Sequence, residues 1–338
     1  MQRERKSRQP KRFRKFLHIL HLCAPKEHPQ MKLITVGTVA FDNIETPFGK
    51  ADKVVGGAAT YISLAASFFL EKQGIVSVVG DDFPTGMMET MRKRGIDQAG
   101  LEILEGKESF FWSGKYHYDM NTRDTLETRL NVLLDLDPKL NAEYKSAEYV
   151  MLGNLDPVVQ AKVLDQVESP ALVVMDTMNF WMDIAMDKLK EVIARVDILT
   201  INDSEARQLS GEHSLVKAAH VIMGMGPKYL VVKKGEHGAL LFNKNRVFFA
   251  PALPLDEVVD PTGAGDTFAG GFIGYLARSG DHSFNNMKRA IIVGSAMASF
   301  CCEKFGVERL LELKQEEIDL RIQQFVDLVD FDIKLVAN

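Results

Sequence analysis

VVDPTGAGDTFAGG, residues 258–271, is the most informative stretch of this chain. A strand-like run ends in it, a glycine-rich turn follows, and a helix begins with small residues. The first backbone N–H groups of a helix have no acceptor within the helix and lie at the positive end of its dipole. Glycines allow these groups to approach an anion closely, so the turn is predicted to hold a phosphate group.

A carboxylate stands directly beside this predicted anion site, because Asp266 follows Gly265. A phosphate would repel the charge of Asp266 unless the side chain is there to accept a proton. A base next to a phosphoryl group is what transfer of that group to a hydroxyl requires. The alternative is a plain glycine-rich turn in which Asp266 caps the helix, and a bare G-x-G-D pattern is compatible with it.

Short apolar runs alternate with segments of helical spacing over most of the chain. Strands are expected at Leu33–Val36, Ile75–Val79, Tyr149–Leu152, Leu172–Met175, Ile198–Ile201 and Tyr229–Val232, and helices at Ala58–Leu70, Thr85–Arg94 and Lys288–Phe300. β-Branched runs that alternate with helices are typical of a parallel sheet covered on both faces. The segments 44–55 and 101–118 look like strands without helices, and we expect them to form a small second sheet that covers the site as a lid.

The whole string, unlike the bare glycine pattern, is specific. It resembles the C-terminal signature of the pfkB (ribokinase-like) family of carbohydrate and nucleoside kinases, D-x-x-G-A-G-D before an apolar helix, and the matching residues are Asp260, Gly263, Ala264, Gly265 and Asp266. The resemblance covers about residues 32–310. It implies a three-layer α/β/α ribokinase-like sandwich with a small β-sheet lid, in a single domain over residues 31–338.

The resemblance also implies the reaction, which is ATP-dependent phosphorylation of a hydroxyl group. Asp266 would take the proton from the acceptor hydroxyl. The N–H groups of Gly263, Ala264 and Gly265 would stabilise the charge that develops on the γ-phosphoryl group.

Three early residues are candidates for the acceptor site. Asp42, Gly56 and Gly57 resemble the family's substrate-binding pieces, where a carboxylate accepts hydroxyl hydrogen bonds and glycines admit a ring close to the backbone. Asn154, just after the strand Tyr149–Leu152, is a further candidate. The alternative for Asp42 is an ordinary turn residue.

Asn202 and Glu205 resemble the family's N-x-x-E element, which lies near the triphosphate and its magnesium ion. Magnesium keeps much of its hydration shell, so both residues are expected to hold it through water. The same spacing is also that of a helix capping box, and one element can serve both purposes. A monovalent cation, K⁺, beside Asp260 is implied by the family alone.

The rest of the nucleotide site is assigned from the resemblance. Lys233, Gly235 and Gly238 match the nucleotide-side turn, although a hairpin turn is an equally simple interpretation. Ser295 and Ala298 lie where the family lines its adenine pocket with small residues. Close helix packing is the alternative for these two.

Composition and charge restrict the remaining possibilities. The 338 residues are 46% apolar and 26% charged with a net charge of −5, and no apolar run reaches the ~18 residues of a membrane span. Three cysteines do not build a disulfide framework or a zinc ribbon, so a reducing, cytoplasmic compartment is expected. The sequence contains no P-loop. It also lacks an early dinucleotide fingerprint, and this second absence disfavours a dehydrogenase.

Residues 1–30 differ from the rest, because they carry nine Lys or Arg and two acids. Their net charge is +7 and that of the remaining chain is −12, so we expect no nucleic-acid partner. Three interpretations compete: an organelle-targeting segment, a nucleic-acid arm, or a non-native, disordered extension upstream of a start at Met31. We favour the extension because a clear strand follows Met31 directly.

The acceptor is not determined by these motifs. The first expectation is a hydroxymethyl group on a sugar or sugar-like molecule, and the alternative is a nucleoside whose base stacks on the aromatic lid. A ligand-binding regulator with weak activity is disfavoured by the intact Asp266. Expected partners are therefore a small-molecule substrate and, through the lid, a second copy of the chain, with neither nucleic acid nor membrane.

Overall fold

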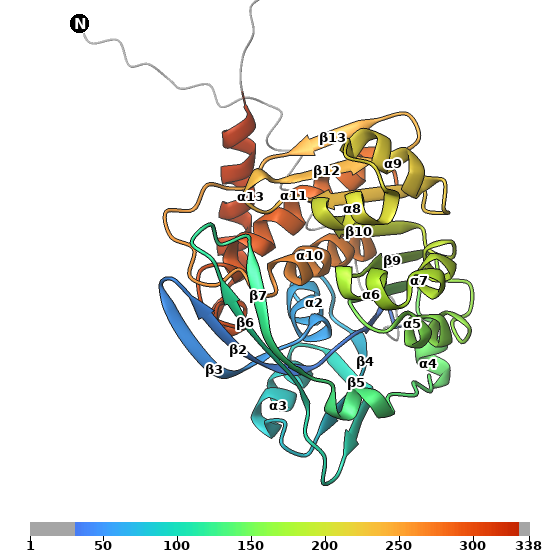
Figure 1. Cartoon of the computed structure of the whole chain (residues 1–338), viewed down its shortest axis with the longest axis vertical. Helices are drawn as coiled ribbons and strands as arrows, with labels where there is room; N and C mark the ends of the chain where they lie inside the picture. Colours follow the sequence, from blue (N-terminus) through green and yellow to red (C-terminus); the bar gives the residue numbers. More distant parts are fainter. Residues whose placement is uncertain (1–30, 331–338) are drawn as a thin grey trace, which may run out of the picture.

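A computed structural model describes residues 31–330 of the chain. The predicted basic extension, residues 1–30, lies outside the described residues. The described part contains one large sheet covered by helices on both faces, with a smaller sheet at its side (Figure 1).

The large sheet has nine strands in the order β13-β12-β11-β10-β9-β8-β1-β4-β5. Their bounds are Leu33–Val36 (β1), Gln73–Gly80 (β4), Ile96–Leu104 (β5), Tyr149–Leu152 (β8), Leu172–Asp176 (β9), Ile198–Asn202 (β10), Tyr229–Lys233 (β11), Ala239–Phe242 (β12) and Val247–Ala250 (β13). The seven strands from β11 to β5 in this order pair in parallel, whereas β12 and β13 add an antiparallel edge. β1, β4, β8 and β9 are buried along their whole length, which explains why their sequences are largely apolar.

Helices cover the two faces in two groups. One face carries Ala58–Ala66 (α2), Thr85–Lys93 (α3), Ala264–Ser279 (α10), Phe284–Cys301 (α11), Glu308–Glu312 (α12) and Gln315–Val329 (α13). The other carries Ala142–Lys145 (α4), Pro157–Leu164 (α5), Asn179–Ile184 (α6), Met186–Ile193 (α7), Asp203–Ser210 (α8) and Leu215–Met223 (α9). Successive strand residues alternate between the two cores, as Leu33 and Ile34 do. The predicted three-layer α/β/α sandwich is confirmed.

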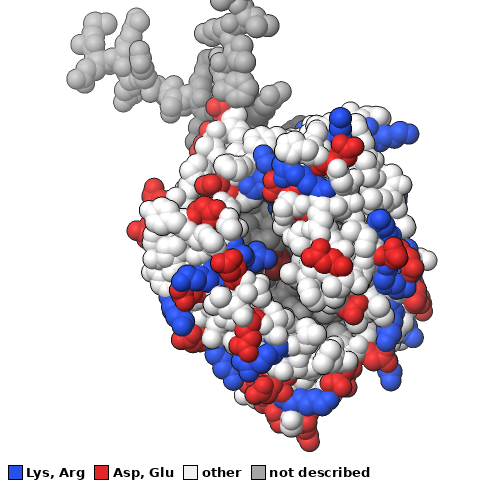
Figure 2. Space-filling view, in the orientation of Figure 1, with Lys and Arg blue, Asp and Glu red and all other residues white. Residues whose placement is uncertain are grey.

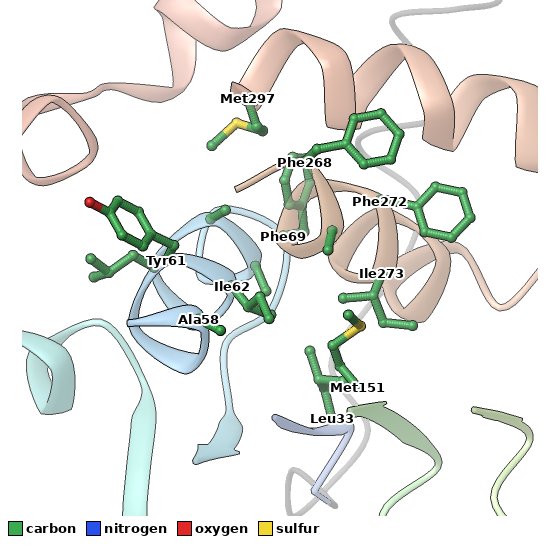
Figure 3. Close-up of a cluster of buried hydrophobic side chains, with 14 of the residues drawn as sticks. Leu33, Ala58, Tyr61, Ile62, Phe69, Met151, Phe268, Phe272, Ile273 and Met297 are labelled. Carbon is green, nitrogen blue, oxygen red and sulfur yellow. The ribbon is translucent and has the colours of Figure 1, made fainter. Parts of the chain in front are cut away.

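The central contact of the first face is between α2 and α10, where Ile62, Phe268 and Ile273 meet above Leu33 and Met151 of the sheet (Figure 3). The small residues that begin α10 explain how closely the two helices approach. A β-carbon at Gly270, for example, would lie 2.3 Å from the backbone oxygen of Ile62. This packing fixes α10, and with it the glycine-rich turn that precedes it.

The smaller sheet is the predicted lid, with the strand order β3-β2-β6-β7. Its strands are Ala40–Thr46 (β2), Gly49–Gly56 (β3), Phe110–Tyr116 (β6) and Arg123–Arg129 (β7). The predicted segment 44–55 is in fact a hairpin of two strands.

The predicted lid strand 101–118 was wrong in its bounds. Residues 101–104 belong to β5, which pairs with β4 in the large sheet, and only residues 110–116 enter the lid. The sequence analysis also missed β7, because all seven of its residues are exposed and its sequence, RDTLETR, shows no apolar alternation. Within residues 31–330, no helix is long and apolar enough to cross a membrane.

Candidate active site

The carboxyl ends of the parallel strands meet at one edge of the large sheet, and β9, β10 and β11 end there at Asp176, Asn202 and Lys233. Figure 2 shows the molecule hollowed between the lid strands and the helices around α10, with acidic and basic side chains along the hollow. Ligands of open α/β sheets bind outside the carboxyl ends of the strands. This hollow, which we call the cleft, is therefore the candidate active site.

The glycine-rich turn adopts a conformation that needs its glycine. Gly263 precedes α10 with a φ of 76°, in the left-handed region that favours glycine. A β-carbon there would lie 2.4 Å from the ring of the buried Tyr61. Asp260 fixes the turn, because its carboxylate accepts the backbone N–H of Thr262 at 2.8 Å and that of Gly306 at 3.0 Å.

Two of the three predicted N–H donors are available to an anion. The N–H groups of Gly263 and Gly265 have no acceptor in the part of the chain that the structure describes. The N–H of Ala264 closes the turn by donating to the carbonyl of Pro261 at 3.1 Å, so its predicted role as a donor does not fit this geometry. The site is still the N-terminus of a 16-residue helix, which favours an anion.

Asp266 lies in the first turn of α10 and is partly exposed to the cleft. Burial raises the pKa of its carboxyl to about 7. The charge of Asp176 adds to this rise, and those of Lys233 and Arg123 oppose it. A carboxyl whose pKa is close to the working pH is well matched to accepting a proton during a reaction.

We expect kcat/KM to rise with pH and to reach half its maximum near the pKa of about 7 of Asp266, because a general base acts only when it is deprotonated. The measurement is kcat/KM for ATP across neutral pH at constant ionic strength. Asp42→Asn is the matched control, because burial raises the pKa of Asp42 to about 8 and this group titrates in the same range. The rise of kcat/KM with pH must persist in Asp42→Asn. A profile that is flat through pH 7 would contradict the assignment.

A buried ion pair that the sequence analysis missed lies beside the turn. Lys233 Nζ donates to Asp176 Oδ2 at 2.5 Å, and the two side chains are 17% and 5% exposed. A β-carbon at Gly265 would lie 3.2 Å from this Nζ, so the ammonium group reaches the start of α10. The one available signal for Asp176 was its place at the end of a buried parallel strand, on the edge where a site is expected.

The three predicted acceptor residues lie together at the base of the lid. Gly56 ends β3, and a β-carbon there would lie 1.9 Å from Asp42 Oδ2 on β2. Gly57, with a φ of 92°, precedes α2, and a β-carbon there would lie 2.5 Å from the carbonyl oxygen of Thr38. Because burial and the charges of Asp260 and Asp266 raise the pKa of Asp42 to about 8, its carboxyl is protonated at neutral pH. It can therefore donate to a hydroxyl as well as accept from one.

Asn154 is engaged by the segment that contains α6. Its Oδ1 accepts a hydrogen bond from Trp181 Nε1 at 2.9 Å, and its Nδ2 donates to Met178 Sδ at 3.0 Å. These bonds hold α6 to the loop after β8. A role of Asn154 as an acceptor ligand stays a prediction.

Asn202 and Glu205 form the capping box that their spacing predicts. Asn202 Oδ1 accepts the N–H of Glu205 at 2.8 Å, and Glu205 Oε2 accepts the N–H of Asn202 at 2.7 Å. Burial raises the pKa of Glu205 to about 7, against the charge of Lys233. The second carboxylate oxygen is not used by the box and fits a water of a magnesium ion. Over residues 31–330, no three His, Cys, Asp or Glu side chains are grouped as a metal site.

The predicted nucleotide-side turn contacts the lid. Gly235 and Gly238, with φ angles of 54° and 86°, enclose the short 3₁₀ helix η3 (Gly235–His237). Asn121, between β6 and β7, donates from Nδ2 to Glu236 Oε1 at 3.3 Å, and a β-carbon at Gly235 would lie 2.1 Å from Asn121 Oδ1. The lid therefore reaches from the acceptor residues to the nucleotide side of the cleft.

Ser295 and Ala298 share a partly exposed face of α11, while Ala296 and Met297 between them are buried. Small side chains on such a face leave room for a flat ring. Their place in an adenine pocket stays a prediction.

One face of the lid is turned toward the catalytic turn and carries residues that no motif marks. Strand pairing places Trp112 beside Asp42 and Arg123 opposite Tyr116, and residues two apart along β6 share a face. Thr262 Oγ1 donates to the hydroxyl of Tyr116 at 3.2 Å, which fixes the direction of this face. We call it the cleft face of the lid.

Comparison with known proteins gives matches over most of the chain. The family model described as pfkB family carbohydrate kinase matches residues 34–313. A cytidine kinase of Thermococcus kodakarensis is 30% identical over 252 residues, which are 73% of this chain and 89% of that protein. A ribokinase of Staphylococcus aureus is 30% identical over 297 residues, which are 82% of this chain and 90% of that protein.

Solved structures match as well. A nucleoside kinase of Methanocaldococcus jannaschii superposes with a TM-score of 0.70 at 22% identity, over 88% of this chain and 100% of that one. A putative ribokinase II of Escherichia coli in complex with ATP and Mg²⁺ gives a TM-score of 0.70 at 21% identity, over 87% of this chain and 99% of that one. At these identities the likeness concerns the fold, and it confirms the predicted ribokinase-like architecture.

Proposed function

Because the chain belongs to the pfkB family of carbohydrate kinases and is an ATP-dependent phosphotransferase acting on a hydroxyl group, we propose that its acceptor is the 5′-hydroxymethyl group of a nucleoside. The relatives include both sugar and nucleoside kinases, so the coarser class is a kinase of one of these two substrate types. The sequence favours a free sugar, with a nucleoside as the alternative. The cleft face of the lid supports the opposite order.

Trp112 is the observation that supports a nucleoside. It is partly exposed and lies beside Asp42 on the neighbouring parallel strand. Its Nε1 donates to Thr125 Oγ1 at 3.3 Å, and its ring covers Gly114, where a β-carbon would lie 2.1 Å from it. The ring is therefore held against the sheet. An aromatic ring one strand away from a residue that binds hydroxyls suits a base joined to a ribose.

In the proposed reaction, Asp42 orients the ribose and Asp266 accepts the proton of its 5′-hydroxyl. The hydroxyl oxygen attacks the γ-phosphorus of ATP, and ADP leaves. The N–H groups of Gly263 and Gly265, with the ammonium group of Lys233, stabilise the charge on the transferred group. A site closed by the lid excludes water, which would compete as an acceptor.

Magnesium fits the acidic side of the cleft, and a structural neighbour was solved with ATP and Mg²⁺. Glu205 and Asn202 would hold the ion through water, and a bound ion neutralises phosphate charge. K⁺ beside Asp260 stays a prediction. Both carboxylate oxygens of Asp260 already accept backbone N–H groups. The homodimer through the lid and the cytoplasmic location also stay predictions.

We expect a screen of ATP consumption to give the highest kcat/KM with a nucleoside, compared with ribose, ketoses and polyols. Trp112→Ala should then raise KM for that nucleoside by roughly 5- to 150-fold, because stacking of one base on an aromatic ring contributes about 1–3 kcal/mol. Trp112→Phe, which keeps a ring, is the matched control and should retain most of the affinity.

A free sugar that is phosphorylated more efficiently than every nucleoside would overturn the proposal. So would a Trp112→Ala enzyme whose KM for the nucleoside is unchanged. KM for ATP is measured in both variants, because a change there would place Trp112 on the nucleotide side.

A further inference from the structure

Arg123 begins β7, and its side chain is exposed on the cleft face of the lid. It lies directly opposite Tyr116, and opposite residues of an antiparallel pair project to the same side of the sheet. The buried Tyr116 accepts its hydrogen bond from Thr262, which lies between Asp260 and the start of α10. The Arg123 guanidinium is therefore on the side of the lid that faces the catalytic turn.

Within residues 31–330, the charge of Arg123 has no partner of opposite charge. The cations Lys115 and Arg129 on the same sheet both form ion pairs. The Arg123 side chain forms neither an ion pair nor a hydrogen bond with any residue that the structure describes. Its recorded contact is with Trp112, whose ring centre lies 6.0 Å from the Arg123 Cζ.

Arg123 nevertheless acts on the acids of the cleft. Its charge lowers the pKa of Asp266 at the start of α10 and that of Glu205 in α8, against the larger effect of burial. These two carboxyls come from different elements, Asp266 from α10 and Glu205 from α8. Arg123 thus faces the space between the base and the residue expected at the magnesium ion.

The lid is held in this position at the turn end of the β6–β7 hairpin. Thr262 binds Tyr116 on one side, and Asn121 binds Glu236 of η3 on the other. Arg123 lies two residues after Asn121, so a lid that contacts the nucleotide-side turn brings the guanidinium over the cleft. An arginine that forms no ion pair within residues 31–330 and is aimed at this space suits a phosphoryl group, whose oxygens can accept two parallel N–H donors of the guanidinium.

We propose that Arg123 contacts the γ-phosphoryl group of ATP and stabilises it during transfer. The bond from the γ-phosphorus to the acceptor oxygen forms while its bond to the β-phosphate oxygen breaks. The acceptor proton goes to Asp266, and ADP departs with the bonding electron pair. Arg123 exchanges no proton and acts through its charge. The inference rests on ATP-dependent transfer to a hydroxyl and is independent of the identity of the acceptor.

The test uses the full chain with Arg123→Ala, Arg123→Lys and a matched control, Arg129→Ala. Arg129 is on the same strand, but the pairing of β6 with β7 shifts register between Ser113 and Gly114, so Arg129 pairs with Phe111 and lies on the opposite face from Arg123. Its Cζ is 4.1 Å from the ring centre of Phe111. Arg123→Ala should lower kcat by about 10²–10³-fold, the usual effect of removing one group that stabilises transition-state charge. Arg123→Lys should recover part of the rate, because it restores a point charge without the planar fork. Arg129→Ala should leave kcat unchanged.

Equilibrium binding gives a readout that a merely structural role would not move. Arg123→Ala should weaken the binding of ATP by roughly tenfold or more and the binding of ADP by much less, because only ATP carries the γ-phosphate. Added guanidinium ion should raise kcat of Arg123→Ala and not that of Arg129→Ala. Thermal melting of each variant establishes that the fold is retained.

Three outcomes for Arg123→Ala would overturn the inference. The first is a kcat within about threefold of that of the unsubstituted enzyme. The second is an equal loss of affinity for ATP and for ADP, and the third is a change confined to a higher KM for the acceptor. The last would make Arg123 an acceptor contact instead. All measurements use whichever acceptor the unsubstituted enzyme phosphorylates, so rejection of the nucleoside proposal leaves this test intact.

Discussion

Asp266→Asn is expected to abolish phosphoryl transfer while ATP binds almost as well as it does to the unsubstituted enzyme. The amide has nearly the shape of the carboxylate but accepts no proton, and loss of a general base typically lowers the rate by about 10²–10⁴-fold. The N–H groups of Gly263 and Gly265 are unaffected by the change, so the anion site of α10 persists. The measurements are kcat and the dissociation constant of ATP.

The same variant should be more stable than the unsubstituted enzyme above neutral pH. The folded-state pKa of Asp266 is about 7, above the ordinary value of 3.8, because burial disfavours the charged form. The unfolded chain therefore releases this proton first, and folding stability falls as pH rises from about 4 to about 7. The amide of the variant has no such proton to lose, so Asp266→Asn should remove this decrease, as urea unfolding at several pH values would reveal.

Asp281→Asn is the control for the loss of one carboxylate. Asp281 is exposed before α11, where hydrogen bonds from Ser283 lower its pKa, so its ionised form stabilises the fold. Its substitution should leave kcat unchanged and stability slightly lower. Activity of Asp266→Asn within a few-fold of the unsubstituted enzyme would remove Asp266 from the mechanism.

The parts of the site that the sequence predicted are those fixed by neighbouring residues. The glycine-rich turn needs Gly263 for a positive φ, and the capping box joins Asn202 to Glu205 three residues later. Both patterns are local, so their geometry follows from a short string. The helix α10 behind the turn was predictable for the same reason, since its small residues signal close packing against α2.

The parts that the sequence did not predict depend on contacts between distant segments. Asp176 and Lys233 are 57 residues apart and meet only because β9, β10 and β11 are neighbours in the sheet. β7 pairs with β6 without any apolar pattern, because it is an edge strand of the lid and all seven of its residues are exposed. The direction in which Arg123 points follows from that pairing, which no spacing along the chain reveals.

Lys233→Met is expected to destabilise the fold and to reduce activity strongly. It leaves Asp176 buried without its cation, and breaking a buried pair by removal of one partner typically costs about 3–5 kcal/mol. It also removes the ammonium group beside Gly265, where the γ-phosphoryl group is proposed to bind, and loss of such a charge typically lowers kcat by about 10²–10³-fold. Urea unfolding and steady-state kinetics measure the two effects separately.

The double variant Lys233→Met/Asp176→Leu separates stability from catalysis. Replacement of a whole buried ion pair by apolar residues of similar size is often neutral or stabilising, so most of the lost stability should return. Activity should not return, because the charge beside the anion site is still missing. A double variant that is both stable and active would mean that Lys233 serves only to neutralise Asp176. Asp176→Asn alone keeps Lys233 in place, and it should therefore retain far more activity than Lys233→Met if the ammonium group acts on the phosphate.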